Sequence, residues 1–303
     1  MEKKDIVDQF VLSRPDAVGV FGYGSGVFKQ ESYSDLDKPQ IDLIFIVDDL
    51  RKWHVENIKL NNGDYSIIGK IHFNLNSLKK IKGFNKITYV SNVKFKDYKF
   101  KYGVVELSDF IKSLKTWNNF FIAGRFQKPT MKIKGNYLID NALNSNIESA
   151  LLVGCLLCDA ETDFIKLYEL ICGLSYLGDI RMSFAENPNK VQNIVKGSIS
   201  NFVRMYLIDL PFIKFNTNCS VIINHKYILE HIDLLPLDLL SYLMDVKTDL
   251  SNLEEVRNNI YKYFRIKNRE ESFHQILDGL KTNGVVKSVP YALAKINKRF
   301  SIK

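Results

Sequence analysis

The sequence contains no uninterrupted run of about 20 apolar residues, the length that a membrane-spanning helix requires. Its first ten residues, MEKKDIVDQF, include acidic side chains and no apolar stretch, so they lack the features of a secretory signal peptide. We therefore expect a protein that does not cross a bilayer and that resides in the cytoplasm.

Cysteine is also scarce. The chain has 4 cysteines, at positions 155, 158, 172 and 219, too few and too unevenly spaced for a disulfide framework. Cys155 and Cys158 form a CxxC motif inside the apolar run ALLVGCLLC, and no second Cys or His pair stands at the spacing of a zinc finger. We expect these thiols to be buried and to pack as small apolar side chains.

Negative charge is in deficit. Lys and Arg number 42 against 34 Asp and Glu, which gives a formal net charge of +8 and an isoelectric point near 9.1. This balance favours an anionic partner, which is a nucleotide, a nucleic acid or an acidic lipid surface. Charge alone does not choose among the three.

At 303 residues the chain is long enough for two domains, since domains usually have about 100–200 residues. Strand-like and helix-like patterns alternate in the first third, and the sequence becomes mostly helical after Lys128-Pro129. We predict a first domain at 1–128, a second at 129–210 that contributes to the active-site cleft, and a C-terminal region at 211–303.

The local patterns predict individual elements. AVGVFGYGSGVF indicates a strand, a tight turn and a helix start, and IDLIFIV indicates a buried strand. DDLRKWHVENIKLN is typical of an N-capped helix, and KITYVSNV and YKFKYGVVEL of two paired strands. Helices are predicted at 107–126, 146–159, 162–176 and 189–208, a strand in CSVIINHKYIL and a helix in HIDLLPLDLLSYLMDV.

A phosphate-binding turn is the first candidate for chemistry. Nucleotidyltransferases of the polymerase-β type hold a triphosphate on a Gly-Ser turn, and Gly24, Ser25 and Gly26 provide such a turn. Glycines let the backbone approach phosphates closely, and exposed N–H groups attract negative charge. Taken alone, a Gly-Ser-Gly turn is more often structural than functional.

Two candidates exist for a metal-binding carboxylate near this turn. Asp35 and Asp37 match the acidic-x-acidic pattern of such enzymes, but Lys38-Pro39 follows them and indicates a loop. Asp42 stands at the head of the buried strand, and metal ligands need a rigid platform, so we favour Asp42. Because residue 44 is isoleucine, another acid must complete the site.

Five blocks follow one another between about residues 20 and 200: GYGSGVFKQ, IDLIFIVDD with WHxxN, YGVVE, FIAGRFQKP, and GLSYLGDIRM with KVQNIVK. In content and order they resemble the mitochondrial-type CDP-diacylglycerol synthases, also called translocator assembly and maintenance proteins. The resemblance implies an α+β fold, with a polymerase-β-type nucleotidyltransferase domain followed by a mainly helical, winged-helix-like domain. It also implies that CTP and phosphatidic acid are the substrates, that CDP-diacylglycerol and pyrophosphate are the products, and that Mg²⁺ or another divalent cation is the cofactor.

The resemblance assigns roles to residues as well. Gly24 and Ser25 would hold the triphosphate within the turn that ends at Gly26, Asp42 would bind the metal ion, and Asp179 in YLGDIRM would supply the completing carboxylate. Side chains expected to contact nucleotide or phosphate are Lys128, Arg181, Lys190 and His54. Outside a family block, the two basic residues at 181 and 190 indicate only a solvated surface helix, and His54 only a hydrogen-bonded structural residue.

The C-terminal stretch 285–303, GVVKSVPYALAKINKRFSIK with its preceding glycine, interleaves apolar and basic residues. Such a segment either lies on an acidic membrane surface or packs on the protein's own core with a solvated basic edge. The family's peripheral membrane association favours the lipid, which predicts a protein on the inner face of the membrane.

Two other functions fit the same features. A nucleotidyltransferase that modifies RNA or a protein would use the same turn, acidic strand and positive charge. A winged-helix nucleic-acid-binding protein would explain the helical second half and the isoelectric point. Residues 146–208 contain no dense Lys/Arg helix with interleaved aromatics, so we expect no nucleic-acid partner. The oligomeric state is left open.

Overall fold

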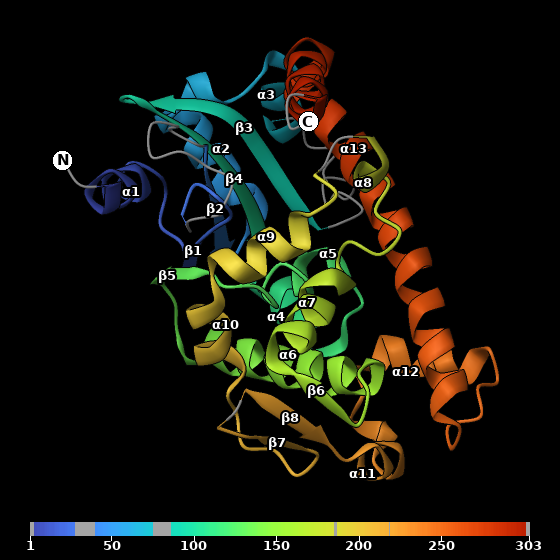
Figure 1. The fold of residues 1–303 in the computed structure, drawn as a ribbon. Helices are drawn as coiled ribbons and strands as arrows, with labels where there is room; N and C mark the ends of the chain where they lie inside the picture. Colours follow the sequence, from blue (N-terminus) through green and yellow to red (C-terminus); the bar gives the residue numbers. More distant parts are fainter. Residues whose placement is uncertain (1–2, 28–39, 75–85, 185–186, 218, 301–303) are drawn as a thin grey trace.

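The computed structural model describes residues 3–27, 40–74, 86–184, 187–217 and 219–300. It is a mixed α+β structure, in which a sheet with helices on both faces is joined to a mainly helical half (Figure 1). The sheet takes the first part of the chain, and one very long helix, α13, runs along one side of the molecule (Figure 1).

The main sheet has five strands in the order β3-β4-β2-β1-β5. Within it β2 and β4 are parallel, and the other neighbouring pairs are antiparallel. The strands are β1 (Gly19–Tyr23), β2 (Ile41–Val47), β3 (Ile87–Phe95), β4 (Tyr98–Glu106) and β5 (Met131–Lys134). The predicted strands in AVGVFGY and IDLIFIV and the predicted hairpin of β3 and β4 are confirmed.

Strand β2 separates two apolar cores, because successive side chains of a strand point to opposite faces. Leu43 and Phe45 belong to one core together with Trp53 of helix α2. Ile44 and Ile46 belong to the core on the other face. Asp42 therefore shares the face of Ile44 and Ile46.

Different helices cover the two faces. The face of Leu43 packs against α1 (Lys3–Leu12) and α2 (Leu50–Leu60). Helix α2 is followed by η1 (Asn62–Asp64) and α3 (Ile67–Asn74). The face of Ile44 packs against α4 (Leu107–Thr116), α5 (Phe120–Ala123) and the first turns of α6 (Tyr137–Leu157). The helix predicted in DDLRKWHVENIKLN is confirmed, and Asp49 is its N-cap, accepting a hydrogen bond from the backbone N–H of Lys52.

The second half is built around a third core. Its elements are α6, β6 (Glu161–Asp163), α7 (Phe164–Leu174), α8 (Arg181–Phe184), α9 (Lys190–Gly197), α10 (Ile199–Tyr206), β7 (Ile213–Phe215), β8 (Ser220–Ile223), α11 (His225–Glu230), η3 (Ile232–Leu234) and α12 (Leu237–Asp245). The three short strands form a small antiparallel sheet in the order β6-β8-β7. Cys155, Cys158 and Cys172 are buried and unpaired in this core, which confirms the interpretation of the CxxC pair as packing residues.

Several predicted boundaries were wrong for local reasons. The helix predicted at 107–126 breaks at Trp117, which adopts a left-handed conformation with φ 58 and donates a hydrogen bond from Nε1 to Asn146 Oδ1 at 2.8 Å. Similarly, the helix predicted at 189–208 breaks at Ser198 between α9 and α10. The strand predicted in CSVIINHKYIL ends at Ile223, because Asn224 caps the short helix α11. After the proposed boundary at Lys128-Pro129, β5 returns to the first sheet beside β1.

Helix α13 (Leu253–Phe300) is 48 residues long. Its first turns bury Val256, Ile260 and Phe264 in the core of the helical half. Its later turns lie against α3 and β3 of the sheet half (Figure 1). The side chains of 277–303 lie outside the described part, so the choice between core and lipid for 285–303 stays open. None of the helices in the described ranges is sufficiently long and apolar to cross a membrane.

A buried ion pair ties α1 to the segment after α2. Arg14 Nη2 lies 3.0 Å from Asp64 Oδ2, and the two side chains are only 2% and 10% exposed. Arg14 also donates to Asn61 Oδ1 at 2.9 Å and stacks on the ring of Phe10 with its Cζ 4.0 Å from the centroid. Removing one partner of such a pair leaves an uncompensated buried charge.

The substitution Arg14→Ala is therefore expected to lower the free energy of unfolding by about 3–5 kcal/mol. Lys132→Ala breaks an ion pair of similar length, 2.6 Å to Asp140, whose side chains are 45% and 43% exposed, and should cost less than about 1 kcal/mol. Urea unfolding of both variants measures the difference. Equal losses would contradict the assignment of Arg14 to a buried structural network.

Candidate active site: a cationic pocket beside Asp42

The Gly-Ser-Gly turn leaves the end of β1 in a conformation that needs its glycines. Gly24 has a φ of +77, and a Cβ on Gly26 would lie 2.1 Å from the backbone oxygen of Gln40. The N–H of Val27 donates to the Gly24 carbonyl at 3.0 Å and closes the turn. The predicted helix start after Val27 falls on residues outside the described ranges.

Asp42 lies directly beneath this turn. It is paired with Tyr23 in β1 and with Lys101 in β4. A Cβ on Gly24 would lie 3.3 Å from Asp42 Oδ2, and Asp42 Oδ1 accepts a hydrogen bond from Gln40 Nε2 at 3.0 Å. The strand thus presents this carboxylate to whatever binds on the glycine turn. The alternative acids, Asp35 and Asp37, fall outside the described residues.

Arg125, which follows α5, brings a half-buried positive charge next to Asp42 and Tyr23. Its Cζ lies 4.3 Å from the centroid of the Tyr23 ring. Burial raises the pKa of Tyr23, Asp42 raises it further, and Arg125 opposes the shift, which shows that the three groups share one field. The Nε of Arg125 is buried and has no hydrogen-bond partner among the described residues.

Lys128, three residues later, is a second cation, and it is buried. Its Nζ donates to Ser175 Oγ at 2.5 Å and lies 5.0 Å from the centroid of the Tyr176 ring. Burial lowers the pKa of Lys128 to about 7, and the charges of Arg125, Lys190 and Arg181 lower it as well. Among the described side chains, no carboxylate forms an ion pair with Lys128.

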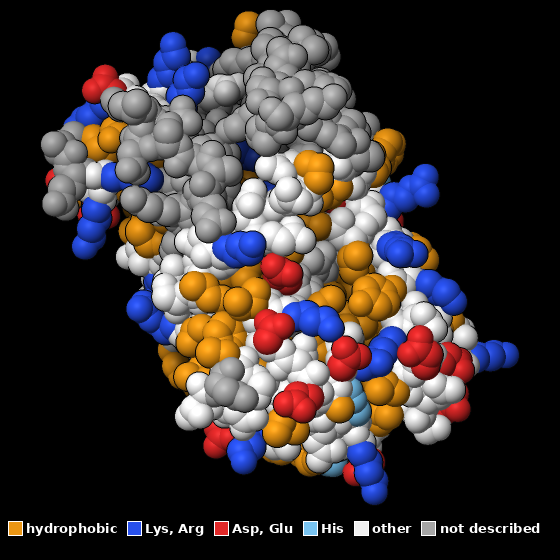
Figure 2. Space-filling model, viewed as in Figure 1, with side chains coloured by type: hydrophobic (Ala, Val, Ile, Leu, Met, Phe, Trp, Pro, Cys, Tyr) orange, Lys and Arg blue, Asp and Glu red, His pale blue; other side chains and the backbone are white. Residues whose placement is uncertain are grey.

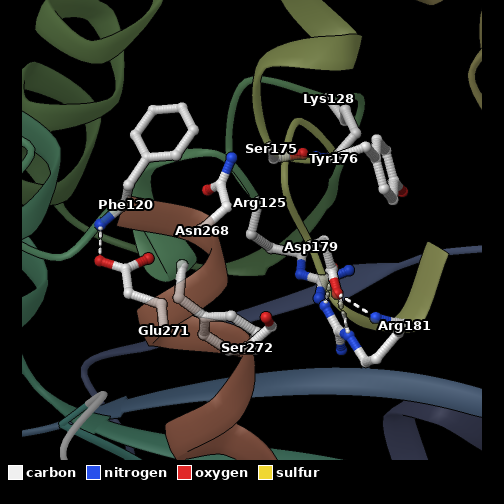
Figure 3. Close-up of a pocket in the computed structure, with 11 residues that line it drawn as sticks. Phe120, Arg125, Lys128, Ser175, Tyr176, Asp179, Arg181, Asn268, Glu271 and Ser272 are labelled. Carbon is white, nitrogen blue, oxygen red and sulfur yellow. Dashed lines mark hydrogen bonds and ion pairs between the residues drawn. The ribbon is translucent and has the colours of Figure 1, made fainter. Parts of the chain in front are cut away.

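These cations border one pocket between the sheet half and the helical half (Figure 3). One wall comes from α5 and the residues after it, a second from the segment between α7 and α8, and a third from α13. The lining residues are Phe120, Phe121, Arg125, Lys128, Ser175, Tyr176, Asp179, Arg181, Asn268, Glu271 and Ser272. Lys190, at the start of α9, adds a further positive charge with its Nζ 5.6 Å from the Tyr176 centroid.

Asp179 and Arg181 are held against each other in this pocket. Arg181 Nε lies 2.9 Å and 3.1 Å from the two carboxylate oxygens of Asp179, and its Nη2 lies 2.5 Å from Oδ2. The backbone N–H of Arg181 also donates to Asp179 Oδ1 at 2.9 Å. In this arrangement both oxygens of Asp179 are engaged by the guanidinium.

The pairing of Asp179 with Arg181 limits the carboxylates that the pocket can offer to a metal ion. The described residues include no group of three or more His, Cys, Asp or Glu side chains arranged to hold a metal ion by themselves. Asp42 can offer one carboxylate, which suits Mg²⁺ because this ion is often bound by one or two carboxylates together with substrate phosphates and water. Asp179 can join only if Arg181 releases it.

The predicted site residues therefore fall into two groups. Lys128, Asp179, Arg181 and Lys190 converge on the pocket, and Arg125 links the pocket to Asp42. His54 lies elsewhere, because α2 covers the opposite face of the sheet from Asp42. It is fully buried, and its Nδ1 lies 2.8 Å from the hydroxyl of Tyr65. In this structure His54 is a core residue rather than a contact for phosphate.

Sequence reasoning missed the wall contributed by α13. Asn268, Glu271 and Ser272 lie more than 70 residues beyond the last family block, which ends at Lys196, in a stretch whose pattern indicates only an amphipathic helix. Glu271 is 8% exposed and accepts a hydrogen bond from the backbone N–H of Phe120 at 2.8 Å. The sequence pattern alone carries no signal for these residues, because their burial and contacts appear only in the folded chain.

Binding of inorganic pyrophosphate at pH 8 is expected to take up protons, because a bound anion stabilises charged Lys128, whose pKa in the free protein is lowered to about 7. Calorimetry in two buffers with different heats of ionisation measures the uptake. Lys128→Met should reduce the uptake and weaken binding roughly 10- to 100-fold, the effect of losing a charged hydrogen bond. Lys132→Met, on the exposed strand β5, serves as the control, and equal behaviour of both variants would contradict the prediction.

Glu271 predicts a pH dependence of stability. Burial raises its pKa from 4.5 to about 7, with Lys267 opposing and Asp238 adding to the shift. A raised pKa means that the folded state binds the proton more tightly, so this stabilisation is complete below pH 4.5 and is lost as pH rises through about 7. In Glu271→Gln, which keeps an oxygen acceptor for Phe120, that loss should be absent. Thermal unfolding of both proteins between pH 4.5 and 7.5 tests this, and parallel curves would contradict it.

Comparison with known proteins supplies a family for this geometry. The family model described as "Phosphatidate cytidylyltransferase, mitochondrial" matches residues 4–298. A protein of that name from Schizosaccharomyces pombe is 36% identical over 311 residues, which cover 91% of this chain and 79% of the relative. The Xenopus laevis protein is 30% identical over 316 residues, with 92% and 89% covered.

A third relative of the same name, from Dictyostelium discoideum, is 33% identical over 228 residues, which cover 68% of this chain and 53% of that protein. The family model spans the glycine turn, Asp42, the cationic pocket and most of α13. On this evidence of extent and identity, the chain belongs to the mitochondrial phosphatidate cytidylyltransferase family.

Proposed function

We propose that this chain is a phosphatidate cytidylyltransferase, which converts CTP and phosphatidic acid to CDP-diacylglycerol and pyrophosphate. The observation that carries the proposal is the pair of neighbouring cations, half-buried Arg125 and buried Lys128, which form no ion pair with a carboxylate among the described residues. Arg125 also lies close to Asp42, the carboxylate beside the glycine turn. Buried charges are normally paired, so such a pocket favours an anionic ligand. The relatives' shared name supplies the identity of the substrates.

The architecture supports the same proposal. We assign residues 1–128 to a nucleotidyltransferase domain of the polymerase-β type, on the basis of strands β1–β4, the glycine turn after β1 and the carboxylate on the neighbouring strand. Strand β5 (Met131–Lys134) follows this range and joins the same sheet. Residues 129–210 and the start of 211–303 combine helices with a small antiparallel sheet, which is compatible with a winged-helix-like domain. The pocket lies where these two parts meet.

In this proposal the triphosphate of CTP lies on the Gly24–Ser25 turn, where the absence of side chains at Gly24 and Gly26 allows backbone N–H groups to approach phosphate oxygens. Arg125 and Lys128 neutralise charge on the phosphates from the opposite side. Arg181 offers its planar guanidinium to a phosphate, and Asp179 orients it. Lys190 adds charge at the rim.

We propose that the divalent ion is Mg²⁺ and that Asp42 would hold it together with phosphate oxygens. Asp179 would become available as a second ligand if a phosphate took its place as the partner of Arg181. Such an ion supplies neutralisation of the charge that develops on the leaving pyrophosphate. The chain's own residues hold the reacting groups in line and exclude water.

The transfer itself requires no side-chain nucleophile. A phosphate oxygen of phosphatidic acid, already ionised near neutral pH, forms a bond to the α-phosphorus of CTP. The bond from that phosphorus to the β-phosphate oxygen breaks, and pyrophosphate leaves with the electron pair. Arg125 and Lys128 stabilise the charge that moves onto pyrophosphate, and this positioning and neutralisation account for the catalysis.

The lipid substrate implies contact with a membrane surface. We propose that the chain associates peripherally with an acidic bilayer and that 285–303 contributes, because its basic and apolar residues alternate along the end of α13. The relatives are named as mitochondrial proteins, and the cytoplasmic location and the inner membrane face stay predictions from the sequence.

The surface of the helical half does not favour a nucleic-acid partner. In the view of Figure 2, basic, acidic and apolar side chains are interspersed over this half, an arrangement unlike the basic stripe of a nucleic-acid-binding face.

The reaction is tested by following CDP-diacylglycerol formation from CTP and phosphatidic acid in mixed micelles with Mg²⁺. Ser25→Ala and Asp42→Asn are each expected to reduce kcat by at least about 100-fold, the effect of removing one preorganised charge-stabilising group. Asp140→Asn, which changes an exposed aspartate at the start of α6, is the matched control and should retain activity. Labelling of RNA by the native chain, with no lipid product, would contradict the proposed acceptor.

A further inference from the structure

The segment 173–181 between α7 and α8 carries pocket residues but has little regular structure of its own. It consists of successive turns, in which Tyr176 N–H donates to the Gly173 carbonyl at 2.8 Å and Asp179 N–H to the Tyr176 carbonyl at 3.2 Å. Helix α7 ends at Leu174, and the last carbonyls of a helix have no partner within it. Something outside the segment must therefore hold it in place.

Asn268 of α13 provides those partners. Its Nδ2 donates to the Leu174 carbonyl at 2.7 Å and to the Leu177 carbonyl at 2.8 Å. Both amide hydrogens are used in these two bonds. Because the side chain is only 5% exposed, water cannot readily replace it as a donor.

Other residues on the same face of α13 extend the contact along the segment. Ser272 Oγ accepts a hydrogen bond from Ile180 N–H at 3.2 Å, and Gln275 Oε1 accepts one from Arg181 Nη1 at 2.5 Å. Gly178 has a φ of +77 and packs so closely on α13 that a Cβ would lie 2.4 Å from the Arg265 carbonyl oxygen. Positions 265, 268, 272 and 275 are spaced by three and four residues, so they share one helix face.

The opposite wall of the pocket is held from the same helix. Glu271 Oε1 accepts a hydrogen bond from the backbone N–H of Phe120 at 2.8 Å, at the first residue of α5. Lys267 Nζ donates to the Asn118 carbonyl at 3.1 Å just before it. Figure 3 shows Asn268, Glu271 and Ser272 projecting from one helix towards the pocket. Helix α13 thus contacts both the wall that leads to Arg125 and the wall that carries Asp179.

We infer that α13 is a clamp for the active site and that Asn268 is its principal positioning residue. Through the Leu174 and Leu177 carbonyls it fixes the turn that places Ser175 against Lys128 and Arg181 against Asp179. The inference rests on the proposed function only in taking the pocket's ligand to be a substrate phosphate. It assigns a role in the reaction to a residue that does not contact the reacting atoms.

The test compares Asn268→Ala and Asn268→Asp with Asn259→Ala. Asn259 is a matched control, because it is also on α13, is 8% exposed and donates one hydrogen bond, to Thr248 Oγ1 at 2.9 Å, away from the pocket. Asn268→Asp keeps the size of the side chain but replaces the two donors by an oxygen. All measurements are made at a temperature at which circular dichroism shows every variant to be folded.

Both Asn268 variants are expected to show faster amide hydrogen exchange in 173–181 and weaker binding of inorganic pyrophosphate. With CTP and phosphatidic acid, kcat should fall by up to about 100-fold, as expected for a displaced catalytic wall. Asn259→Ala should change neither exchange in this segment nor pyrophosphate binding, whatever it costs in stability.

Equal exchange and equal pyrophosphate affinity in Asn268→Ala and Asn259→Ala would overturn the clamp. Faster exchange with unchanged pyrophosphate affinity and kcat would also overturn it, because the turn would then move without consequence for the site. If the native chain makes no CDP-diacylglycerol, the proposed function fails, and hydrogen exchange together with pyrophosphate binding still decides the role of Asn268.

Discussion

The concentration of positive charge around buried Lys128, which forms no ion pair with a carboxylate in the described part of the chain, is the constraint on which the site depends. Arg125 and Lys128 stand between two apolar cores, and burial together with the neighbouring positive charges lowers the pKa of Lys128 to about 7. A purely structural role does not explain why two such cations lie together, because burying a charge without an ion-pair partner carries a desolvation cost. A bound polyphosphate supplies the missing negative charge, and the glycine turn and Asp42 lie where it would be received.

The fold assembles this site from parts that are distant in the sequence. Strand β2 points Asp42 to the face covered by α5, and the residues after α5 bring in Arg125 and Lys128. The turn between α7 and α8 supplies the Asp179–Arg181 pair. Helix α13 contacts both α5 and the turn between α7 and α8. The geometry of the pocket therefore depends on a helix that begins more than 70 residues after the Asp179–Arg181 pair. The site lies between the two halves because each half supplies part of the pocket's walls.

The sequence predicted what depends on local patterns. Apolar runs located β1, β2 and the hairpin of β3 and β4, and they placed Asp42 at the head of the buried strand β2. The break at Trp117 was missed, because a left-handed residue stabilised by burial and by a hydrogen bond to Asn146 leaves no local signal. His54 was misplaced for a similar reason, since WHxxN describes one helix and does not say which face of the sheet that helix covers. Asn268 and Glu271 were missed because only tertiary contacts give them a role.

The most direct measurement is a crystal structure of the chain with a non-hydrolysable CTP analogue and Mg²⁺. The triphosphate is expected to lie between the Gly24–Ser25 turn and the pair Arg125 and Lys128, with Asp42 at the metal ion. Binding of the nucleotide on the other face of the sheet, near α1 and α2, or in a position where its phosphates contact neither cation, would contradict this expectation.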